Sequence, residues 1–202
     1  MELDQSIALL QKEQWISEQE EIRQKERDKY DLKKQIKYTL EELIEGVKSG
    51  KQFLYALKME FEPRELFDSG LKLPYIKNFF SVEKEEPDSL FWGCDKRKVS
   101  MVIMCISNSR IKQPFKEWVT QSKDALRASN LKVRLLHSKA VGKMEYFCYE
   151  APTSEGITYN VTFRYTRAGK IYVGSYNCMN EDKEGMGLLL EALVHVTEEI
   201  NQ

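Results

Sequence analysis

The sequence lacks an excess of either charge. Its 202 residues carry 31 Lys and Arg against 32 Asp and Glu, which gives a formal net charge of −1 at pH 7. Proteins that bind nucleic acid through bulk electrostatics are usually strongly basic. The composition therefore argues against a nucleic-acid partner. The hydrophobic fraction of 42% is sufficient for a folded core, so wholesale disorder is not expected.

Segments that would direct the chain to a membrane are also missing. The stretch from Met1 to Gln5 lacks the basic and apolar parts of a signal peptide. No stretch approaches the roughly 18 apolar residues that suggest a transmembrane helix. We therefore predict a cytoplasmic protein that does not contact a membrane.

Signatures of cofactors and metals are absent as well. Nothing matches the G-x-G-x-x-G or G-x-x-x-x-G-K-[ST] loops that cradle phosphates. The histidines and cysteines are too widely spaced to suggest a zinc site. The sequence therefore predicts no cofactor, no metal, no catalytic residue and no enzyme. In a reducing compartment the cysteines are most simply buried thiols, namely Cys94, Cys105, Cys148 and Cys178.

One nucleophilic arrangement stays conceivable. The two histidines are His137, on an expected strand, and His195, beside the apolar stripe of the expected final helix. Cys148 and His137 could form a nucleophile pair if their strands are neighbours in the sheet. Cysteines in the middle of apolar strands are usually inert, which favours a structural role for both residues.

Proline is missing from the N-terminal part. Between residues 3 and 47 there is no proline, Gly46 is the single glycine, and Glu, Lys and Gln are frequent, which predicts a long helix. The charged stretch from Glu18 to Lys29 is too polar for a core. We interpret residues 1–47 as a coiled-coil-like arm that pairs with a second copy or docks on a different protein. Its first apolar positions are Leu3, Ile7, Leu10 and Trp15.

The remainder of the chain is predicted to fold as one domain. Gly46, Ser49 and Gly50 are expected to end the helix. Residues 48–70 are interpreted as a partly packed connector, and residues 71–202 as an α/β domain.

A β-hairpin is the clearest element of that domain. From Ile157 to Thr166 apolar and polar residues alternate, and Ile171 to Cys178 is again rich in aromatic and β-branched residues. The four residues Arg167 to Lys170 lie between these runs. We predict a tight turn there, with Gly169 in the left-handed conformation that such turns need.

The other expected elements indicate how the sheet is covered. Val99 to Ile106 is apolar on both faces, which is typical of a central strand covered on each side. Leu71 to Pro74 reads as an edge strand that the proline ends. Apolar positions at helical spacing predict helices from Pro114 to about Asn130 and from Met186 to Ile200. The order predicts an α+β fold: a three-layer α/β/α sandwich with a mostly antiparallel sheet, preceded by the long N-terminal helix.

Four segments of the expected domain carry a resemblance to a known family: Leu71 to Pro74, Pro114 to Trp118, Val141 to Tyr146 and Gly169 to Val173. With the order of the elements, they resemble the PsbP-like family, and more closely its bacterial DcrB-like members, over about residues 71–200. The resemblance implies the sandwich fold and implies binding rather than catalysis, because some DcrB-like relatives act as chaperones or adaptors for secreted effectors.

Two functions follow as hypotheses. The first is a non-enzymatic protein–protein interaction module, such as an adaptor or chaperone linked to bacterial secretion, that forms a homodimer or holds its partner through the N-terminal helix. The alternative is a small-molecule or enzymatic site in a cleft between sheet and helix, built from Tyr, Arg and His137. Tyrosine and arginine are frequent in interfaces, so the predicted partner-binding residues are Leu3, Ile7, Leu10, Trp15, Tyr159, Arg164, Arg167 and Tyr172.

Overall fold

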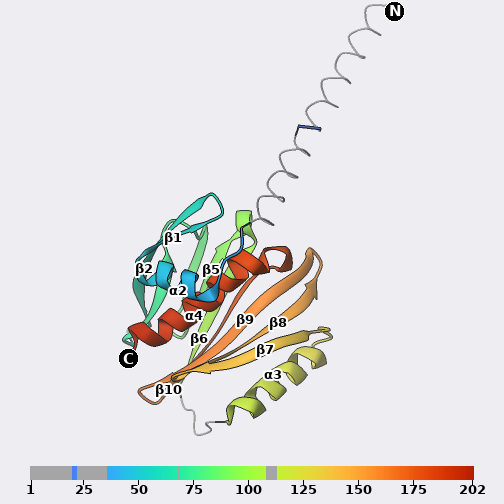
Figure 1. Ribbon diagram of the computed structural model, residues 1–202. Coiled ribbons are helices and arrows are strands. Elements are labelled where there is room, and N and C mark those ends of the chain that lie inside the picture. Colours follow the sequence, from blue (N-terminus) through green and yellow to red (C-terminus); the bar gives the residue numbers. More distant parts are fainter. Residues whose placement is uncertain (1–19, 22–35, 68, 108–112) are drawn as a thin grey trace, which may run out of the picture. The chain divides into compact units, whose positions relative to one another are not determined.

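A computed structural model describes residues 20–21, 36–67, 69–107 and 113–202 (Figure 1). The chain divides into two units, Met1–Lys37 and Tyr38–Gln202. Most of the predicted N-terminal arm lies outside the described residues, so its helix and its dimerisation stay predictions. The second unit contains the two sheets and the helices described below.

The predicted continuous helix over residues 3–47 is wrong at residues 36–39, whereas the segment from residue 40 to residue 47 is helical. Residues 36–39 are not helical, and helix α2 (Leu40–Lys48) begins only after Thr39. Thr39 and Glu42 form a capping box, in which each side chain accepts a hydrogen bond from the other residue's backbone N–H, at 3.2 and 2.9 Å. This cap starts a new helix because it satisfies N–H groups that a continuous helix would have paired. The apolar face of α2 then packs against helix α4 (Leu188–Ile200).

Removal of this cap should weaken the docked helix measurably. We expect Thr39→Ala to lower the free energy of unfolding by about 1 kcal/mol, because the N–H of Glu42 loses its acceptor at a helix start. Thr39→Ser keeps the hydroxyl and should stay within about 0.5 kcal/mol of the parent. Urea unfolding followed by circular dichroism checks both values. Equal losses in the two variants would contradict the capping role.

Residues 48–70, predicted as a connector, contain two strands. Strand β1 (Lys51–Leu54) pairs with β2 (Leu57–Leu66), and β2 pairs with β3 (Leu71–Ile76), all antiparallel. We call this the small sheet. Pro74 lies inside β3 and does not end it, which corrects the prediction. Its cross-strand partner is Pro63 of β2. In an antiparallel ladder every second residue pair exchanges no backbone hydrogen bonds, so two prolines, which lack an N–H, can lie opposite each other at such a pair.

The remaining strands of the described residues form a seven-stranded antiparallel sheet, the main sheet, in the order β4-β5-β6-β10-β9-β8-β7. The predicted hairpin is confirmed: Ala168 and Gly169 form its two-residue turn, with φ of 49° and 76°. The strands of the main sheet are β4 (Val82–Glu85), β5 (Ser89–Cys94), β6 (Val99–Ser107), β7 (Arg134–Val141), β8 (Met144–Thr153), β9 (Gly156–Arg167) and β10 (Lys170–Met179).

Helices α3 and α4 contact opposite faces of the main sheet. Successive side chains of a strand point to opposite faces. On β8, Tyr146 and Cys148 belong to the large core that includes α4, whereas Phe147 and Tyr149 pack against α3 (Phe115–Ala128), which lies beside β7 (Figure 1). Mostly antiparallel sheets with a few helices confirm the α+β class. Short helical turns complete the fold: η1 (Asp95–Arg97), η2 (Asn180–Asp182) and the π-helix η3 (Lys183–Gly187).

The prediction that β6 is covered on both faces is wrong. Val99, Met101 and Ile103 are buried, but Val102 and Met104 on the other face are 42% and 53% exposed. Helix α3 packs over β8 instead and leaves this side of β6 uncovered. Within the described ranges, no helix is long and apolar enough to cross a membrane.

Candidate functional site

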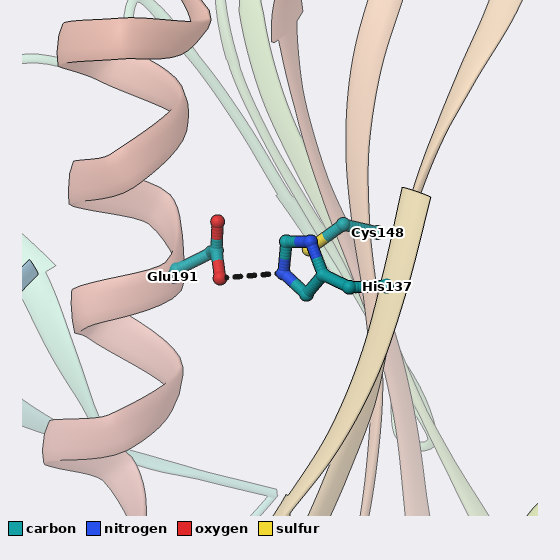
Figure 2. Close-up of side chains that lie close together, drawn as sticks. All are labelled: His137, Cys148 and Glu191. Atoms are coloured by element: carbon teal, nitrogen blue, oxygen red, sulfur yellow. Dashed lines mark hydrogen bonds and ion pairs between the residues drawn. The ribbon is translucent and has the colours of Figure 1, made fainter. Parts of the chain in front are cut away.

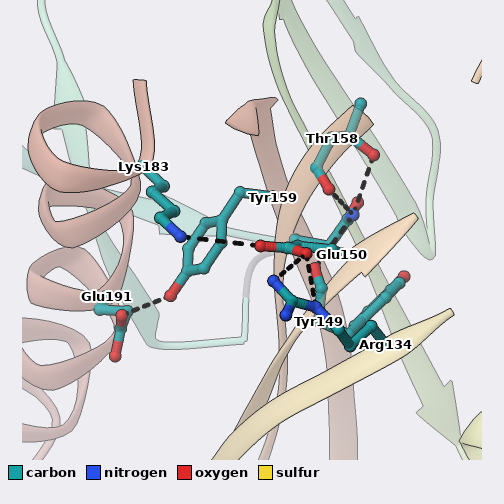
Figure 3. Close-up of polar contacts among 8 residues, drawn as sticks. Arg134, Tyr149, Glu150, Thr158, Tyr159, Lys183 and Glu191 are labelled. Atoms are coloured by element: carbon teal, nitrogen blue, oxygen red, sulfur yellow. Dashed lines mark hydrogen bonds and ion pairs between the residues drawn. The ribbon is translucent and has the colours of Figure 1, made fainter. Parts of the chain in front are cut away.

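A buried carboxylate lies between helix α4 and the main sheet. Glu191 is 2% exposed on the sheet-facing side of α4. Its Oε1 accepts a hydrogen bond from Tyr159 Oη at 2.6 Å (Figure 3), and its Oε2 lies 3.0 Å from His137 Nε2 (Figure 2). Oε2 also accepts a hydrogen bond from Tyr146 Oη at 3.2 Å. His195, one turn further along α4, lies 3.0 Å from Tyr146 Oη through its Nε2. These five residues, with Cys148, form what we call the Glu191 cluster.

The sheet register brings His137 and Cys148 together. His137 on β7 is the cross-strand partner of Cys148 on β8, next to a register shift between Leu135 and His137. The condition for the nucleophile pair, that the two strands be neighbours, is therefore met. Cys148 is fully buried, and burial raises the pKa of its thiol far above the ordinary value. A protonated, buried thiol is a poor nucleophile, so the geometry does not support the catalytic pair.

The protonation states of the Glu191 cluster follow from its hydrogen bonds. Burial by itself would raise the pKa of Glu191, but the hydrogen bonds from His137, Tyr159 and Tyr146 outweigh burial and lower it. Burial and the nearby carboxylate raise the pKa of Tyr146. Burial also lowers the pKa of His195. Glu191 is therefore a carboxylate at neutral pH, and the hydroxyl groups of Tyr146 and Tyr159 donate hydrogen bonds to it.

A second buried carboxylate lies nearby on β8. Glu150 is 6% exposed, and its Oε2 accepts a hydrogen bond from Arg134 Nε at 2.8 Å and forms an ion pair with Arg134 Nη2 at 2.6 Å (Figure 3). Lys183 Nζ lies 3.8 Å from the other oxygen. The neighbouring Asn160 side chain donates to Thr158 Oγ1 at 3.0 Å. The contacts neutralise the charge of Glu150, which fits a structural role.

The predicted partner-binding residues of the hairpin are not surface residues. Tyr159 and Tyr172 are 4% and 1% exposed and belong to the core. Arg164 is buried by its ion pair with Glu145 and by the ring of Trp118, 4.7 Å from the guanidinium carbon. The alternation of apolar and polar residues correctly predicted that these residues lie on strands. It could not predict which face of the main sheet α4 or α3 covers.

The other predicted partner-binding residues are Arg167 of the hairpin and four positions of the N-terminal arm. Arg167 is half-buried and donates to Asn201 Oδ1 at 2.5 Å, which ties the hairpin to the end of α4. The four positions of the N-terminal arm lie outside the described residues: Leu3, Ile7, Leu10 and Trp15.

The uncovered side of the main sheet carries a row of exposed apolar side chains. Phe91 on β5 is the cross-strand partner of Val102 on β6. Met104 and Ile106 follow at alternate positions of β6, so all four point to one face. Their exposed fractions are 37% to 53%. We call these four residues the apolar face.

A hollow of about 360 Å³ adjoins the apolar face at one end. Phe91 belongs to both, and Ser100 and Asn177 continue the hollow along β6 and β10. The turn between β8 and β9 closes it with Thr153 and Glu155. This hollow lies at strand ends, whereas the predicted cleft was placed between sheet and helix. At the predicted place, between the main sheet and helix α4, lie the hydrogen-bonded side chains of the Glu191 cluster.

Comparisons with known proteins bear on the fold. No family model matches the chain, and no curated protein matches it. The solution structure of cyanobacterial PsbP (CyanoP) from Synechocystis sp. PCC 6803 is similar with a TM-score of 0.55 and 9% identity, over 66% of this chain and 88% of that one. A Pseudomonas aeruginosa protein of unknown function, PA94, gives a TM-score of 0.41 and 10% identity, over 67% of this chain and 94% of that one. The domain has a PsbP-like fold.

Proposed function

We propose that this chain is a non-enzymatic protein-binding module, and that the apolar face of the main sheet binds its partner. The observation that carries the proposal is the exposure of Phe91, Val102, Met104 and Ile106 in one row. Antiparallel sheets with one solvated face normally show polar side chains there. Contiguous exposed apolar side chains indicate an interaction site.

The composition of this face favours a protein over a small ligand. A pocket for a small molecule is concave and encloses most of its ligand. Phe91 and Met104 instead project from the open side of an extended sheet, and of these two side chains Phe91 also lines the hollow at the strand ends. An aromatic ring and a flexible thioether can adapt to a protein surface of complementary shape. The partner should therefore present an apolar patch of its own.

We further propose that the chain acts as an adaptor. A PsbP-like domain with an uncovered sheet face, preceded by an arm with apolar positions such as Leu3 and Ile7, offers two separate contact regions. One partner could be a second copy that pairs through residues 1–47, and the other a client protein on the apolar face. The DcrB-like resemblance, in which some relatives are chaperones or adaptors, fits such a cytoplasmic role.

A charge placed on the apolar face should abolish partner binding and leave the fold intact. Because Met104 is 53% exposed, Met104→Asp should change the free energy of unfolding by no more than about 0.5 kcal/mol. A photo-crosslinking amino acid at position 104, introduced in cells that normally make the protein, should yield one strong adduct, and Val102→Asp in the same chain should remove it.

The matched control is the same amino acid at Asp124, an exposed position of α3 that lies away from the apolar face. It should give no adduct above background. Equal crosslinking at positions 104 and 124, or an adduct that survives Val102→Asp, would contradict the proposal. Mass spectrometry of the adduct distinguishes a second copy of this chain from another protein.

A further inference from the structure

We propose that His137, Cys148 and Glu191 form a binding site for Zn²⁺ between the main sheet and helix α4. The three residues come from β7, β8 and α4, and each offers a ligand atom (Figure 2). These atoms, a histidine ring nitrogen, Cys148 Sγ and a carboxylate oxygen, all lie within 4.8 Å of one another. Among the described residues this is a convergence of three different ligand types at one point.

The three ligand atoms lie within 4.8 Å of one another, a limit slightly wider than the spacing of the ligand atoms in a zinc site, so the side chains would have to move only a small distance. Zinc bonds of about 2.0–2.3 Å place the ligand atoms of a tetrahedral site roughly 3.3–3.8 Å apart. Side-chain movements on the order of 1 Å would therefore suffice. His137 and Cys148 are cross-strand partners, so the sheet fixes their spacing. Glu191 is held from the opposite side by α4.

The ligand chemistry selects the metal. A thiolate and an imidazole favour zinc over magnesium or calcium, which prefer oxygen ligands. Three protein ligands leave the fourth tetrahedral position for a water molecule. The His137 side chain is 35% exposed and opens the cluster to solvent, whereas the other two ligands are buried. The ion and the water can therefore reach the site past the imidazole.

The hydrogen bonds around Glu191 already orient it for this role. Tyr159 donates to Oε1 at 2.6 Å, which leaves Oε2 directed at His137 Nε2. Such outer hydrogen bonds orient metal ligands in many sites. On binding, Zn²⁺ takes the place of the contact between Oε2 and Nε2, the imidazole carries its proton on Nδ1, and the Cys148 thiol releases its proton to solvent.

This inference does not depend on the proposed function. Cys148 faces α4, whereas the apolar face lies on the opposite side of the main sheet. A protein that binds a partner without zinc, or zinc without a partner, is consistent with one proposal and inconsistent with the other. The two can therefore fail separately.

Cobalt binding to the full-length, untagged, chelator-treated protein tests the site. We expect Co²⁺ to bind at a single molar equivalent, with near-ultraviolet charge-transfer absorption from the Cys148 thiolate and visible bands of tetrahedral intensity. Zn²⁺ should bleach both. Absence of a charge-transfer band at saturating Co²⁺ would overturn the proposal.

Variants assign the signal to its residues. Cys148→Ser should abolish the charge-transfer band, and the control Cys105→Ser, on β6, should keep it. His137→Ala should weaken Zn²⁺ binding in a competition assay by about 100-fold or more, because loss of a ligand exceeds the 10–100-fold typical of outer partners. His137 is partly exposed near the sheet edge, so this variant keeps the fold even if Cys148→Ser does not. Unchanged affinity in His137→Ala, or a band that persists in Cys148→Ser, would overturn the assignment.

Discussion

Glu191→Ala is expected to lower the free energy of unfolding by about 3–5 kcal/mol, a large part of the stability of a domain of this size. The carboxylate accepts hydrogen bonds from Tyr159 and Tyr146 inside the core and faces His137. Its removal leaves the buried Tyr159 hydroxyl without this acceptor, and a buried donor without a partner costs about 1–3 kcal/mol. Alanine also leaves a void between α4 and β8 that close packing does not fill.

Urea unfolding in the presence of a chelator measures this loss without a contribution from bound metal. Glu199→Ala is the matched control, because Glu199 lies on the same helix but is 42% exposed and pairs only with Lys48 among the described residues. Exposed pairs contribute about 0–1 kcal/mol. Glu191→Gln should fall between the two, since the amide keeps one acceptor oxygen. Equal losses for Glu191→Ala and Glu199→Ala would show that the buried cluster contributes nothing to stability.

Local sequence patterns were sufficient for the elements whose determinants are local. The hairpin of β9 and β10 was predictable because alternation fixes the strands and Gly169 takes a positive φ at the turn. Helix α3 was predictable from Phe115, Trp118 and Leu126, whose spacing makes one apolar face. In both cases the residues that decide the structure are close in sequence.

Elements decided by tertiary packing were not predictable in the same way. The start of α2 at Thr39 depends on the capping box and on docking against α4, whereas helix propensity alone continues through residues 36–39. An apolar pattern on both faces of β6 predicts two covered faces. The same pattern fits a strand with one covered and one exposed face, and only the position of α3 distinguishes the two arrangements.

The Glu191 cluster shows the same limit at the level of a site. The sequence named His137 and Cys148 as a pair that depends on neighbouring strands, and the register confirms that condition. Glu191 was missed because a single carboxylate on an apolar helix carries no motif. Its one sequence signal is its position among Leu190, Ala192 and Leu193, where a charge must find partners to be buried.

The largest single loss of packing is expected for Trp92→Ala, at about 3–5 kcal/mol. Trp92 on β5 is 1% exposed and contacts Tyr75 of β3 edge to face, with ring centroids 5.0 Å apart. Its ring also lies 5.3 Å from the guanidinium carbon of Arg64 on β2 and 5.4 Å from the ring of Phe80. The indole therefore joins the small sheet to the main sheet, and no smaller side chain reaches all of these groups.

Trp92→Phe separates the packing of the ring from its polar atom. The indole Nε1 of Trp92 has no hydrogen-bond partner among the described residues, so phenylalanine removes a donor that contributes nothing and keeps most of the aromatic contact with Tyr75. We expect a loss of less than about 1.5 kcal/mol. Hydrogen exchange should show faster opening of β3 in Trp92→Ala than in Trp92→Phe, because Tyr75 of β3 loses its contact with the indole ring. If both variants lose the same stability, the N–H has a partner and the ring is not what joins the sheets.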